Sequence, residues 1–464
     1  MLERRQSGLL TDLYELTMAA GYVGGAGGSV RFGEAWATFE LFVRSFPPRR
    51  NFLVAAGLEQ ALDFLENVRF SSEEIAYLRG LPVFRKISPG FFDYLAAFRF
   101  TGDAWALPEG TIFFAEEPLL RVRAPIAEGQ LVETSLLSIL HFQTLIASKA
   151  VRLFAAAGGR PVIEFGSRRA HGSEAGVLAA RAAFIGGCAG TSNVFAGHRF
   201  GLPVYGTQAH SWIMAHEDEA EAFRTFTELF PQDAVLLADT YDVRAAVEKI
   251  IALGRAPRGI RLDSGDILGD SIWARRRLDQ AGWNEVQVFA SGDLDEDHIA
   301  ALVNAGACVD AFGVGTSLVA SADAPHLNII YKLAEIERGG QARGVAKLSE
   351  AKKTYPGRKQ VFRFRDAEGR LCGDVVGLED EQFTAAEPLL APVLRGGRRL
   401  NTTAEDSAAA VRAARERFLS NCEQLPKRLL SLEPLQEAFL VRHSERLEAL
   451  FEQVRKTLVQ PASI

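Results

Sequence analysis

Short apolar runs alternate with polar or glycine-rich clusters along the middle of the chain, between residues 160 and 320. The runs begin near Val162, Ala183, Val204, Val235, Gly259, Val286 and Val309, so successive starts lie 21 to 31 residues apart. Segments with helical periodicity separate the runs, and one of them begins at the acidic Asp295 and stops at Gly306. Repeated strand and helix units of this length predict a sheet of parallel strands.

Two arrangements of such strands fit the repeat: an incomplete (β/α) barrel of about seven parallel strands, or a doubly wound open sheet. Nearly every apolar run is followed directly by glycines, hydroxyls or charged side chains that a ligand can use. Barrel enzymes collect their binding groups at the carboxyl ends of the strands, so this distribution favours the incomplete α/β barrel.

The two flanking regions mix helical and strand-like patterns. Before the repeat, helical periodicity is visible at Asp12–Tyr22 and Leu58–Leu65, a strand-like stretch at Phe113–Pro125, and one long apolar helix at Glu133–Val151. After it, strand-like segments and a glycine and arginine loop at Arg395–Arg399 precede helical patterns. The last helix is predicted to pack through Leu440, Leu447, Leu450, Phe451, Val454 and Leu458. We therefore predict an N-terminal α/β domain over 1–150, a catalytic barrel over 151–340, and a C-terminal extension over 341–464.

Composition and charge narrow the class of protein. The 464 residues are 48% hydrophobic and 24% charged, which is typical of a soluble globular protein. A net charge of −6, from 52 basic and 58 acidic side chains, lacks the basic excess of a nucleic-acid binder. No apolar stretch is long enough to span a membrane, and the N-terminus lacks the apolar segment of a signal peptide. Four cysteines without a paired spacing fit a reducing compartment, so we expect a cytoplasmic protein that binds neither nucleic acid nor membrane.

The first candidate for ligand binding is the segment Phe312–Ser317, where glycines and two hydroxyls follow an apolar run. Glycines let a ligand approach the backbone closely, and amides at the start of a helix attract anions. The segment therefore predicts a phosphate site, with an ordinary turn between strand and helix as the alternative.

The second candidate is the pair Arg261 and Asp263, which alternation along the strand places on one face. A guanidinium binds a carboxylate or phosphate through its planar fork, and a neighbouring aspartate can accept from hydroxyls or hold Mg²⁺. A structural salt bridge is the alternative interpretation.

Further carboxylates follow two neighbouring runs, at Asp239, Asp242 and Asp293. Oxygen ligands next to phosphate suit Mg²⁺, which takes one or two carboxylates and keeps water. Helix capping is the alternative for Asp293 and Asp295.

Two other strand ends carry candidate side chains. Arg168 and Arg169 add positive charge after the first run and Phe165 offers an aromatic face, although paired arginines are also common on solvated surfaces. His210 follows the third run, within Gly206–Trp212. An imidazole there can act as a base, a metal ligand or a nucleophile that accepts phosphate, whereas a lone histidine is more often structural.

Taken together, these strings resemble the nicotinate phosphoribosyltransferases, a family of type II phosphoribosyltransferases. The resemblance covers about three quarters of the chain, in order, through residues 10–18, 164–172, 190–197, 206–212, 262–266, 312–317 and 347–359. Several strings at consistent separations are more specific than any one of them.

The resemblance implies an incomplete α/β barrel joined to an N-terminal α/β domain, working as a homodimer with active sites shared across the interface. It also implies a reaction in NAD salvage, with Mg²⁺ as cofactor and ATP as co-substrate. Nicotinate, 5-phosphoribosyl 1-diphosphate, ATP and water would give nicotinate mononucleotide, diphosphate, ADP and phosphate.

The resemblance also implies roles for single residues. His210 would be the catalytic histidine that ATP phosphorylates, Arg261 the partner of the nicotinate carboxylate, and Asp263 a catalytic neighbour that holds the ribose. Phe165, with Tyr14 of the second subunit, would sandwich the pyridine ring. The remaining contacts to substrate would come from Arg168, Thr207, Gly292, Asp293, Gly313, Gly315 and Thr316, and those to Mg²⁺ from Asp239, Asp242 and Asp293.

Two further features concern specificity and loop closure. The related nicotinamide enzymes carry an acidic residue at the position that resembles Ser192, so the neutral serine favours the nicotinate anion. The basic stretch Lys347–Arg363 is predicted either to close over the phosphates or to form a solvated hairpin.

Other functions stay open from the sequence. The alternatives within enzymes are a nicotinamide phosphoribosyltransferase and, third, a quinolinate phosphoribosyltransferase, whose family lacks the phosphorylated histidine. A non-catalytic protein that binds a pyridine nucleotide is another. An aldolase or isomerase is disfavoured, because no lysine follows any of the seven runs.

Overall fold

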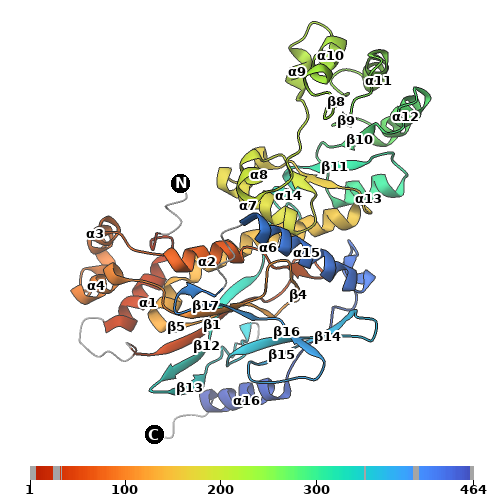
Figure 1. The fold of residues 1–464 in the computed structure, drawn as a ribbon. Coiled ribbons are helices and arrows are strands. Elements are labelled where there is room, and N and C mark those ends of the chain that lie inside the picture. Colours follow the sequence, from red (N-terminus) through yellow and green to blue (C-terminus); the bar gives the residue numbers. More distant parts are fainter. Residues whose placement is uncertain (1–6, 25–31, 33, 350–351, 401–406, 460–464) are drawn as a thin grey trace.

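The computed structural model describes residues 7–24, 32, 34–349, 352–400 and 407–459. Within them the strands form sheets of seven, six, four and two strands. Figure 1 shows that the helices and strands between β6 and α14 form one lobe, and that the seven-stranded and four-stranded sheets lie in the other.

The six-stranded sheet contains the predicted parallel strands. It comprises β6 (Val162–Glu164), β7 (Gly190–Thr191), β8 (Val235–Leu237), β9 (Gly259–Leu262), β10 (Gln287–Ala290) and β11 (Ala311–Val314). The order is β7-β6-β11-β10-β9-β8, and each neighbouring pair is parallel. The α/β class with a parallel sheet is therefore confirmed, whereas closure into a barrel stays a prediction.

Two of the seven predicted strand positions differ from the structure. The second run was expected to start near Ala183, but residues 183–185 complete a helix, α7 (Ser173–Ile185), because their apolar side chains continue its buried face. The third run forms only a single parallel bridge, between Val204 and Thr191. Pro203, directly before Val204, has no amide hydrogen for a strand ladder, which limits pairing there.

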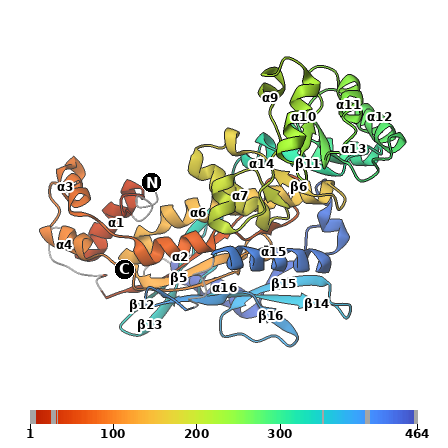
Figure 2. The ribbon, with the colours of Figure 1, turned by 45° about the horizontal axis from the view of Figure 1, so that its top comes forward.

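Helices connect the parallel strands and cover the sheet. They are α7, α8 (Val194–Phe200), α9 (His210–Met214), α10 (Glu219–Leu229), α11 (Val243–Ala252), α12 (Ile267–Gln280), α13 (Glu296–Asn304) and α14 (Thr316–Val319). The predicted helix after Asp295 is α13, and the Asp295 side chain caps it by accepting from the amide of His298 at 2.9 Å. In Figure 2, α9 to α12 gather at the end of this lobe that lies farthest from α1 to α4.

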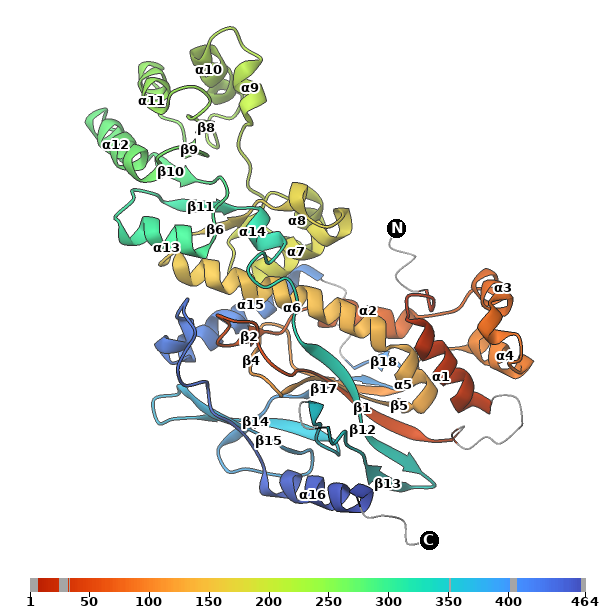
Figure 3. The ribbon, with the colours of Figure 1, turned by 180° about the vertical axis from the view of Figure 1, so that it is seen from behind.

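The N-terminal region contains the predicted helices and strand. Its helices are α1 (Leu13–Gly24), α2 (Leu58–Asn67), α3 (Ser72–Gly80), α4 (Pro89–Ala97), α5 (Ile126–Leu131) and α6 (Glu133–Ala156). Its strands are β1 (Trp36–Val43), β2 (Leu53–Val54), β3 (Asp103–Ala106), β4 (Ile112–Phe113) and β5 (Pro118–Pro125). The long helix α6 lies between the parallel sheet and the antiparallel sheet that contains β1 and β5 (Figure 3).

The C-terminal region returns to the N-terminal sheet. It contains β12 (Ile329–Arg338), β13 (Gln341–Gly344), β14 (Lys359–Arg365), β15 (Leu371–Leu378), β16 (Ala386–Pro388), β17 (Ala391–Arg395), β18 (Arg398–Arg399), α15 (Ser407–Gln424), β19 (Val441–His443) and α16 (Glu445–Val459). Strand β12 pairs with β1, and β17 pairs with β3. The domain boundaries near residues 150 and 340 stay predictions.

The stripe predicted on the last helix is only partly buried. Leu447 and Phe451 of α16 are buried, whereas Leu440 and Leu458 are 50% and 51% exposed. Leu440 lies before β19 rather than on the helix, so its inclusion in the stripe was wrong. Across the described ranges, no helix combines the length and the apolar character needed to cross a membrane.

Candidate functional site

Arg261 is the centre of a cluster of polar side chains at the carboxyl end of the parallel sheet. Its Nε donates to Ser291 Oγ at 2.7 Å, Nη1 to Thr207 Oγ1 at 2.9 Å, and Nη2 to Asp263 Oδ1 at 2.5 Å. These partners come from the ends of β9 and β10 and from the segment before α9. A guanidinium has five N–H groups, so this one retains capacity for an anion beyond its three close acceptors.

Asp263 connects Arg261 to His210. Its Oδ1 also accepts from Ser291 Oγ at 2.5 Å, and its Oδ2 lies 3.7 Å from His210 Nε2. Burial alone would raise the pKa of Asp263, but the Ser291 hydrogen bond and the charge of Arg261 hold this pKa below its ordinary value. Asp263 is therefore an anion at neutral pH, and its second carboxylate oxygen is directed towards the imidazole of His210.

His210 is the first residue of α9, and its side chain is 43% exposed. Its Nδ1 is buried and has no hydrogen-bond partner in the described part of the chain. Nε2, which faces Asp263, is therefore the ring nitrogen in position to react or to bind.

Phe165 and Gly313 place an aromatic ring beside Arg261. The centroid of the Phe165 ring lies 5.8 Å from Arg261 Cζ. A Cβ atom at residue 313 would approach this ring to 2.6 Å, so only glycine allows the ring to lie over β11. An aromatic face next to a guanidinium suits a flat ring that carries a negative substituent.

The turns after β10 and β11 contain residues with unusual backbone angles and close contacts to neighbouring backbone atoms. Gly292 has φ +89°, and a Cβ there would lie 1.7 Å from the carbonyl oxygen of Asp263. Asp293 adopts φ 47°, which is uncommon for a residue with a side chain. Ser317 Oγ donates to the carbonyl oxygen of Leu294 at 2.7 Å, and this bond joins the two turns. Gly315 lies between β11 and α14, and Thr316 is the first residue of α14, at the same sheet edge.

The predicted magnesium ligands differ in how their oxygens are used. Asp239 Oδ2 accepts from Ser264 Oγ at 2.6 Å, whereas its Oδ1 is buried without a partner among the described residues. Asp242 caps α11 by accepting from the amide of Ala245 at 2.8 Å. Nowhere in the described ranges do three His, Cys, Asp or Glu side chains gather as a metal cage. Asp239 thus fits Mg²⁺ that is held mainly by water and substrate phosphates better than Asp242 does.

Arg168 and Ser192 follow the other strands of the same sheet. Arg168 lies in a helical turn over Ser167–Arg169 after β6, and its side chain is exposed. Ser192 follows β7, is half-buried, and donates its amide to the carbonyl oxygen of Glu164 at 2.9 Å. Parallel strands end at one edge, so both residues lie at the edge that carries Arg261.

Tyr14 lies elsewhere in the chain. It belongs to α1 and is 47% exposed. Burial of its hydroxyl, together with the nearby Glu133 and Glu15, raises the pKa of Tyr14. In Figure 1, α1 lies in the other lobe, far from β9. One copy of the chain therefore does not bring Tyr14 to the Arg261 cluster.

The stretch Lys347–Arg363 is part loop and part strand. It runs through a loop into β14, and the amide of Lys347 donates to Thr354 Oγ1 at 2.9 Å. Residues 350 and 351 of this stretch lie outside the described residues. Its role over phosphates stays a prediction.

Two polar residues of the cluster were missed by the sequence reasoning. Ser291 bonds to both Arg261 and Asp263, and its position follows from register, because Phe289 pairs with Arg261 and Ser291 therefore lies beside Asp263. Gln208 is 5% exposed, and neither its Oε1 nor its Nε2 has a partner among the described side chains or backbone. No sequence pattern distinguishes Gln208 from a surface residue.

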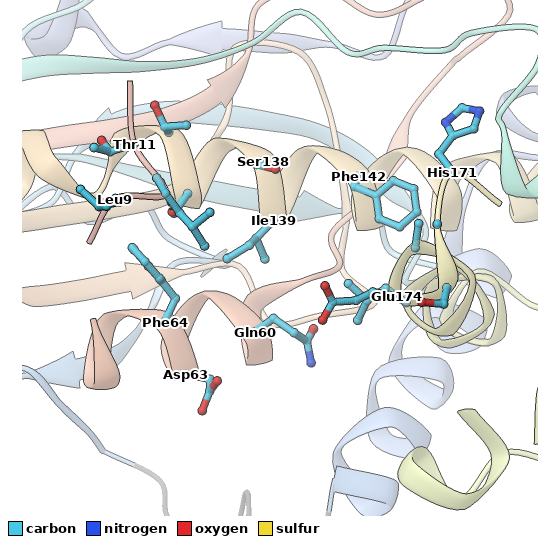
Figure 4. Close-up of a pocket in the computed structure, with 17 residues that line it drawn as sticks. Leu9, Thr11, Gln60, Asp63, Phe64, Ser138, Ile139, Phe142, His171 and Glu174 are labelled. Carbon is cyan, nitrogen blue, oxygen red and sulfur yellow. Dashed lines mark hydrogen bonds between the residues drawn. The ribbon is translucent and has the colours of Figure 1, made fainter. Parts of the chain in front are cut away.

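A separate cavity of about 790 Å³ lies between residues 9–11, α2, α6 and residues 171–178. Figure 4 shows it bordered by Gln60 and Phe64 on α2, by Ile139 and Phe142 on α6, and by Glu174. None of the residues of the Arg261 cluster lines it, so this cavity is separate from the candidate site.

Comparison with known proteins gives consistent matches over most of the chain. Residues 9–141 match the family described as nicotinate phosphoribosyltransferase (NAPRTase) N-terminal domain, and residues 161–379 match the nicotinate phosphoribosyltransferase (NAPRTase) family. The chain is 44% identical to nicotinate phosphoribosyltransferase pncB2 of Mycobacterium tuberculosis, over 95% of this chain and 92% of that protein. It is 42% identical to nicotinate phosphoribosyltransferase of Bacillus subtilis, over 81% and 76% respectively.

Two solved structures are similar over nearly the whole length. The crystal structure of human nicotinic acid phosphoribosyltransferase superposes with a TM-score of 0.81 at 27% identity, covering 96% of this chain and 99% of that one. The structure of nicotinate-nucleotide pyrophosphorylase from Pyrococcus furiosus gives a TM-score of 0.70 at 27% identity, covering 90% and 95%.

Proposed function

The chain belongs to the nicotinate phosphoribosyltransferase family, and from this membership and the Arg261 cluster we propose that it makes nicotinate mononucleotide for NAD salvage. The substrates are nicotinate and 5-phosphoribosyl 1-diphosphate. The observation that supports the proposal is that Asp263 contacts both Arg261 and His210 at one sheet edge, beside the Phe165 ring.

Nicotinate binding follows from the chemistry of Arg261 and Phe165. The guanidinium donates charge-assisted hydrogen bonds to the carboxylate, and Phe165 supports one face of the pyridine ring. The pyridine nitrogen is itself the nucleophile, so the site needs orientation rather than a strong base. Ser192 adds no negative charge at the same edge, which suits the nicotinate anion better than an acidic residue would.

The phosphoribosyl donor is assigned to the turns after β6, β10 and β11. In this assignment, the amides of Gly313, Gly315 and Thr316, with Arg168, hold the 5-phosphate. Asp263 and the Gly292–Asp293 turn hold the ribose and the diphosphate side. Departure of diphosphate leaves positive charge on the sugar, so fixed charges around it lower the barrier.

We assign Mg²⁺ to Asp239 and Asp293 in this site. The unpartnered Oδ1 of Asp239 gives one acceptor for a bound water or for the ion. Mg²⁺ when bound supplies charge neutralisation for the departing diphosphate. Asp242 stabilises the start of α11 instead, because its carboxylate already caps that helix.

ATP coupling is assigned to His210. Nε2 is the nitrogen that accepts the phosphoryl group, because Nδ1 is buried and the side chain is partly exposed. Asp263 stabilises the positive charge that the ring acquires. The added phosphate brings roughly two negative charges beside the donor site, and these change the affinities for substrates and products. Its later hydrolysis gives ADP and phosphate overall.

The proposed assembly is a homodimer in which the partner copy contributes Tyr14. The residues Leu10, Leu13, Tyr14 and Met18 expose an apolar surface at the start of α1, between 38% and 51% exposed. Val194 and Phe195 at the start of α8 are 72% and 54% exposed, close in sequence to Ser192. Association of these two surfaces would cover both and bring a second ring face to Phe165.

A cytoplasmic location completes the proposal. None of the four cysteines, Cys188, Cys308, Cys372 and Cys422, forms a disulfide. Free thiols at all four positions are compatible with a reducing compartment.

A product assay tests the proposed function. The purified protein is incubated with 5-phosphoribosyl 1-diphosphate, Mg²⁺ and either nicotinate or nicotinamide, each with and without ATP. We expect nicotinate mononucleotide as the main product, with ADP formed alongside when ATP is present. Preferential conversion of nicotinamide, or no conversion of either base, would overturn the assignment.

A further inference from the structure

Five charged side chains form a largely buried cluster between α6 and the helices that follow β10 and β11. This cluster, called here the Lys149 cluster, consists of Arg50, Lys149, Arg152, Glu296 and Asp323. The side chains of Lys149, Arg50 and Glu296 are 1%, 1% and 2% exposed, and those of Arg152 and Asp323 are 6% and 23% exposed. Helix α6 packs against both α13 and α14 around it.

Lys149 is bonded to both carboxylates of the cluster. Its Nζ donates to Glu296 and lies 2.8 Å from Asp323 Oδ1. Arg152 Nε donates to Glu296 Oε1 at 2.6 Å, and Arg50 Nη1 donates to Asp323 Oδ2 at 2.6 Å. Burial would raise the pKa of Asp323, but the bonds from Arg50 and Lys149 hold it well below the ordinary value. Both carboxylates therefore connect to α6 through one shared ammonium group.

The two carboxylates follow the two turns that the proposed function assigns to phosphates. Glu296 opens α13, three residues after Asp293. Asp323 lies beyond the end of α14, seven residues after Thr316. At their near ends the turns are already joined by the Ser317 hydrogen bond to Leu294. Lys149 connects the two turns a second time, through its bonds to Glu296 and Asp323.

Fold stability alone is a poor reason for such a cluster. Desolvation offsets most of the attraction in a buried ion pair, and apolar side chains of similar size often hold helices together equally well. Apolar packing, however, is not directional, whereas hydrogen bonds from one ammonium group fix the distance between two carboxylates.

We propose that Lys149 is a positioning residue that sets the spacing between the Asp293 turn and the Thr316 turn, and so the affinity for 5-phosphoribosyl 1-diphosphate. The inference rests on the proposed function, in which these turns hold the phosphates. Spacing matters there because a misplacement of about 1 Å at a reacting group can cost about 100-fold in rate. The nicotinate contacts of Arg261 and Phe165 do not pass through Lys149.

The test is Lys149→Met in the full chain. We expect the KM for 5-phosphoribosyl 1-diphosphate to rise about tenfold while the KM for nicotinate changes less than about twofold. Calorimetric affinity for ribose 5-phosphate should fall by a similar factor. The matched control is Lys249→Met, which breaks a contact of 3.1 Å to Glu219, another buried carboxylate in the same lobe. Glu219 opens α10 and adjoins neither turn, so both KM values should stay unchanged.

A second variant separates positioning from folding. Removing Lys149 alone leaves Glu296 short of one cation, whereas Lys149→Met combined with Glu296→Gln removes one charge of each sign. The double variant should recover thermal stability and keep the raised KM for the phosphoribosyl donor. The proposal is overturned if a stable variant binds ribose 5-phosphate as the parent does, or if both KM values rise together. Lack of nicotinate turnover by the parent would instead overturn the proposed function, and ribose 5-phosphate affinity would still decide the role of Lys149.

Discussion

Asp263 Oδ1 lies 2.5 Å from Nη2 of Arg261, two residues away on the same strand end. The pair neutralises itself in the absence of substrate, yet the cation keeps N–H groups and the anion keeps its second oxygen towards His210. A site for a carboxylate and a ribose uses both signs of charge, because the cation pairs with the carboxylate and the anion accepts from the ribose hydroxyls. Arg261 in β9 and Asp263 directly after this strand supply the two charges.

Replacement of Arg261 by lysine should reduce nicotinate use strongly. The lysine keeps the charge but loses the planar fork that bonds Ser291, Thr207 and Asp263 at once. We expect kcat/KM for nicotinate to fall about 100-fold, which corresponds to about 2.7 kcal/mol. Steady-state kinetics against the control Arg258→Lys, an exposed arginine paired with Asp233, measures this effect. Equal kinetics in both variants would place the carboxylate partner elsewhere.

Replacement of Asp263 by asparagine should slow phosphorylation of His210. The change removes the negative charge 3.7 Å from Nε2 while keeping the size of the side chain. We expect the rate at which ATP labels the protein with acid-labile phosphate to fall about tenfold or more, and no label in His210→Ala. Rapid-quench labelling with radioactive ATP gives the rate. Unchanged labelling in His210→Ala would contradict the role of this histidine.

A methyl group at Gly292 should damage the turn after β10. The new Cβ would meet the Asp263 carbonyl oxygen, at a backbone φ of +89° that disfavours a side chain. We expect Gly292→Ala to lower the free energy of unfolding by about 3 kcal/mol. Gly282→Ala is the matched control, because its φ is +77° but no atom lies within 4 Å of the new Cβ. It should cost about 1 kcal/mol in urea unfolding. A similar loss of unfolding free energy in both variants would show that the close contact with the Asp263 carbonyl oxygen does not determine the stability of this turn.

Glu15 should make folding stability depend on pH. Burial raises the pKa of Glu15 to about 7, with Glu133 and Asp12 adding to the shift and hydrogen bonds from Thr134 opposing it. The unfolded chain loses this proton at lower pH than the folded chain, so stability should fall as pH rises from about 4.5 to about 7. Denaturation at pH 5 and pH 8 measures the difference in the free energy of unfolding between these two pH values. In Glu15→Gln this difference should be smaller by about 1 to 2 kcal/mol. The exposed Glu285→Gln should leave it intact. The same slope in Glu15→Gln would exclude this residue as its source.

The parallel strands and most helices were predictable because their signals are local. The run at Val309 and the glycines after it are adjacent in the chain, and so are the acidic start and the glycine stop around α13. The strand start predicted at Ala183 was wrong because the signal there is only local. Three apolar residues fit the buried face of a helix as well as a strand. Whether the run at Val204 forms a strand depends on pairing with neighbouring segments, which the sequence of the run itself does not specify.

The candidate site was predictable in its residue types and less so in its contacts. Arg261 and Asp263 stand out because charged residues directly follow an apolar strand. The bonds from Ser291 and Thr207 depend on the register of β9 with β10 and on the path of the chain before α9. The Lys149 cluster had no visible pattern, because its members come from segments between residues 50 and 323.

A crystal structure with nicotinate mononucleotide would locate both ends of the product at once and so decide where the substrates bind. We expect the carboxylate within hydrogen-bonding distance of Arg261, the pyridine ring against Phe165, and the 5-phosphate on the backbone amides between Gly313 and Thr316. Product bound in the 790 Å³ cavity between α2 and α6, with the Arg261 cluster unchanged, would contradict this expectation.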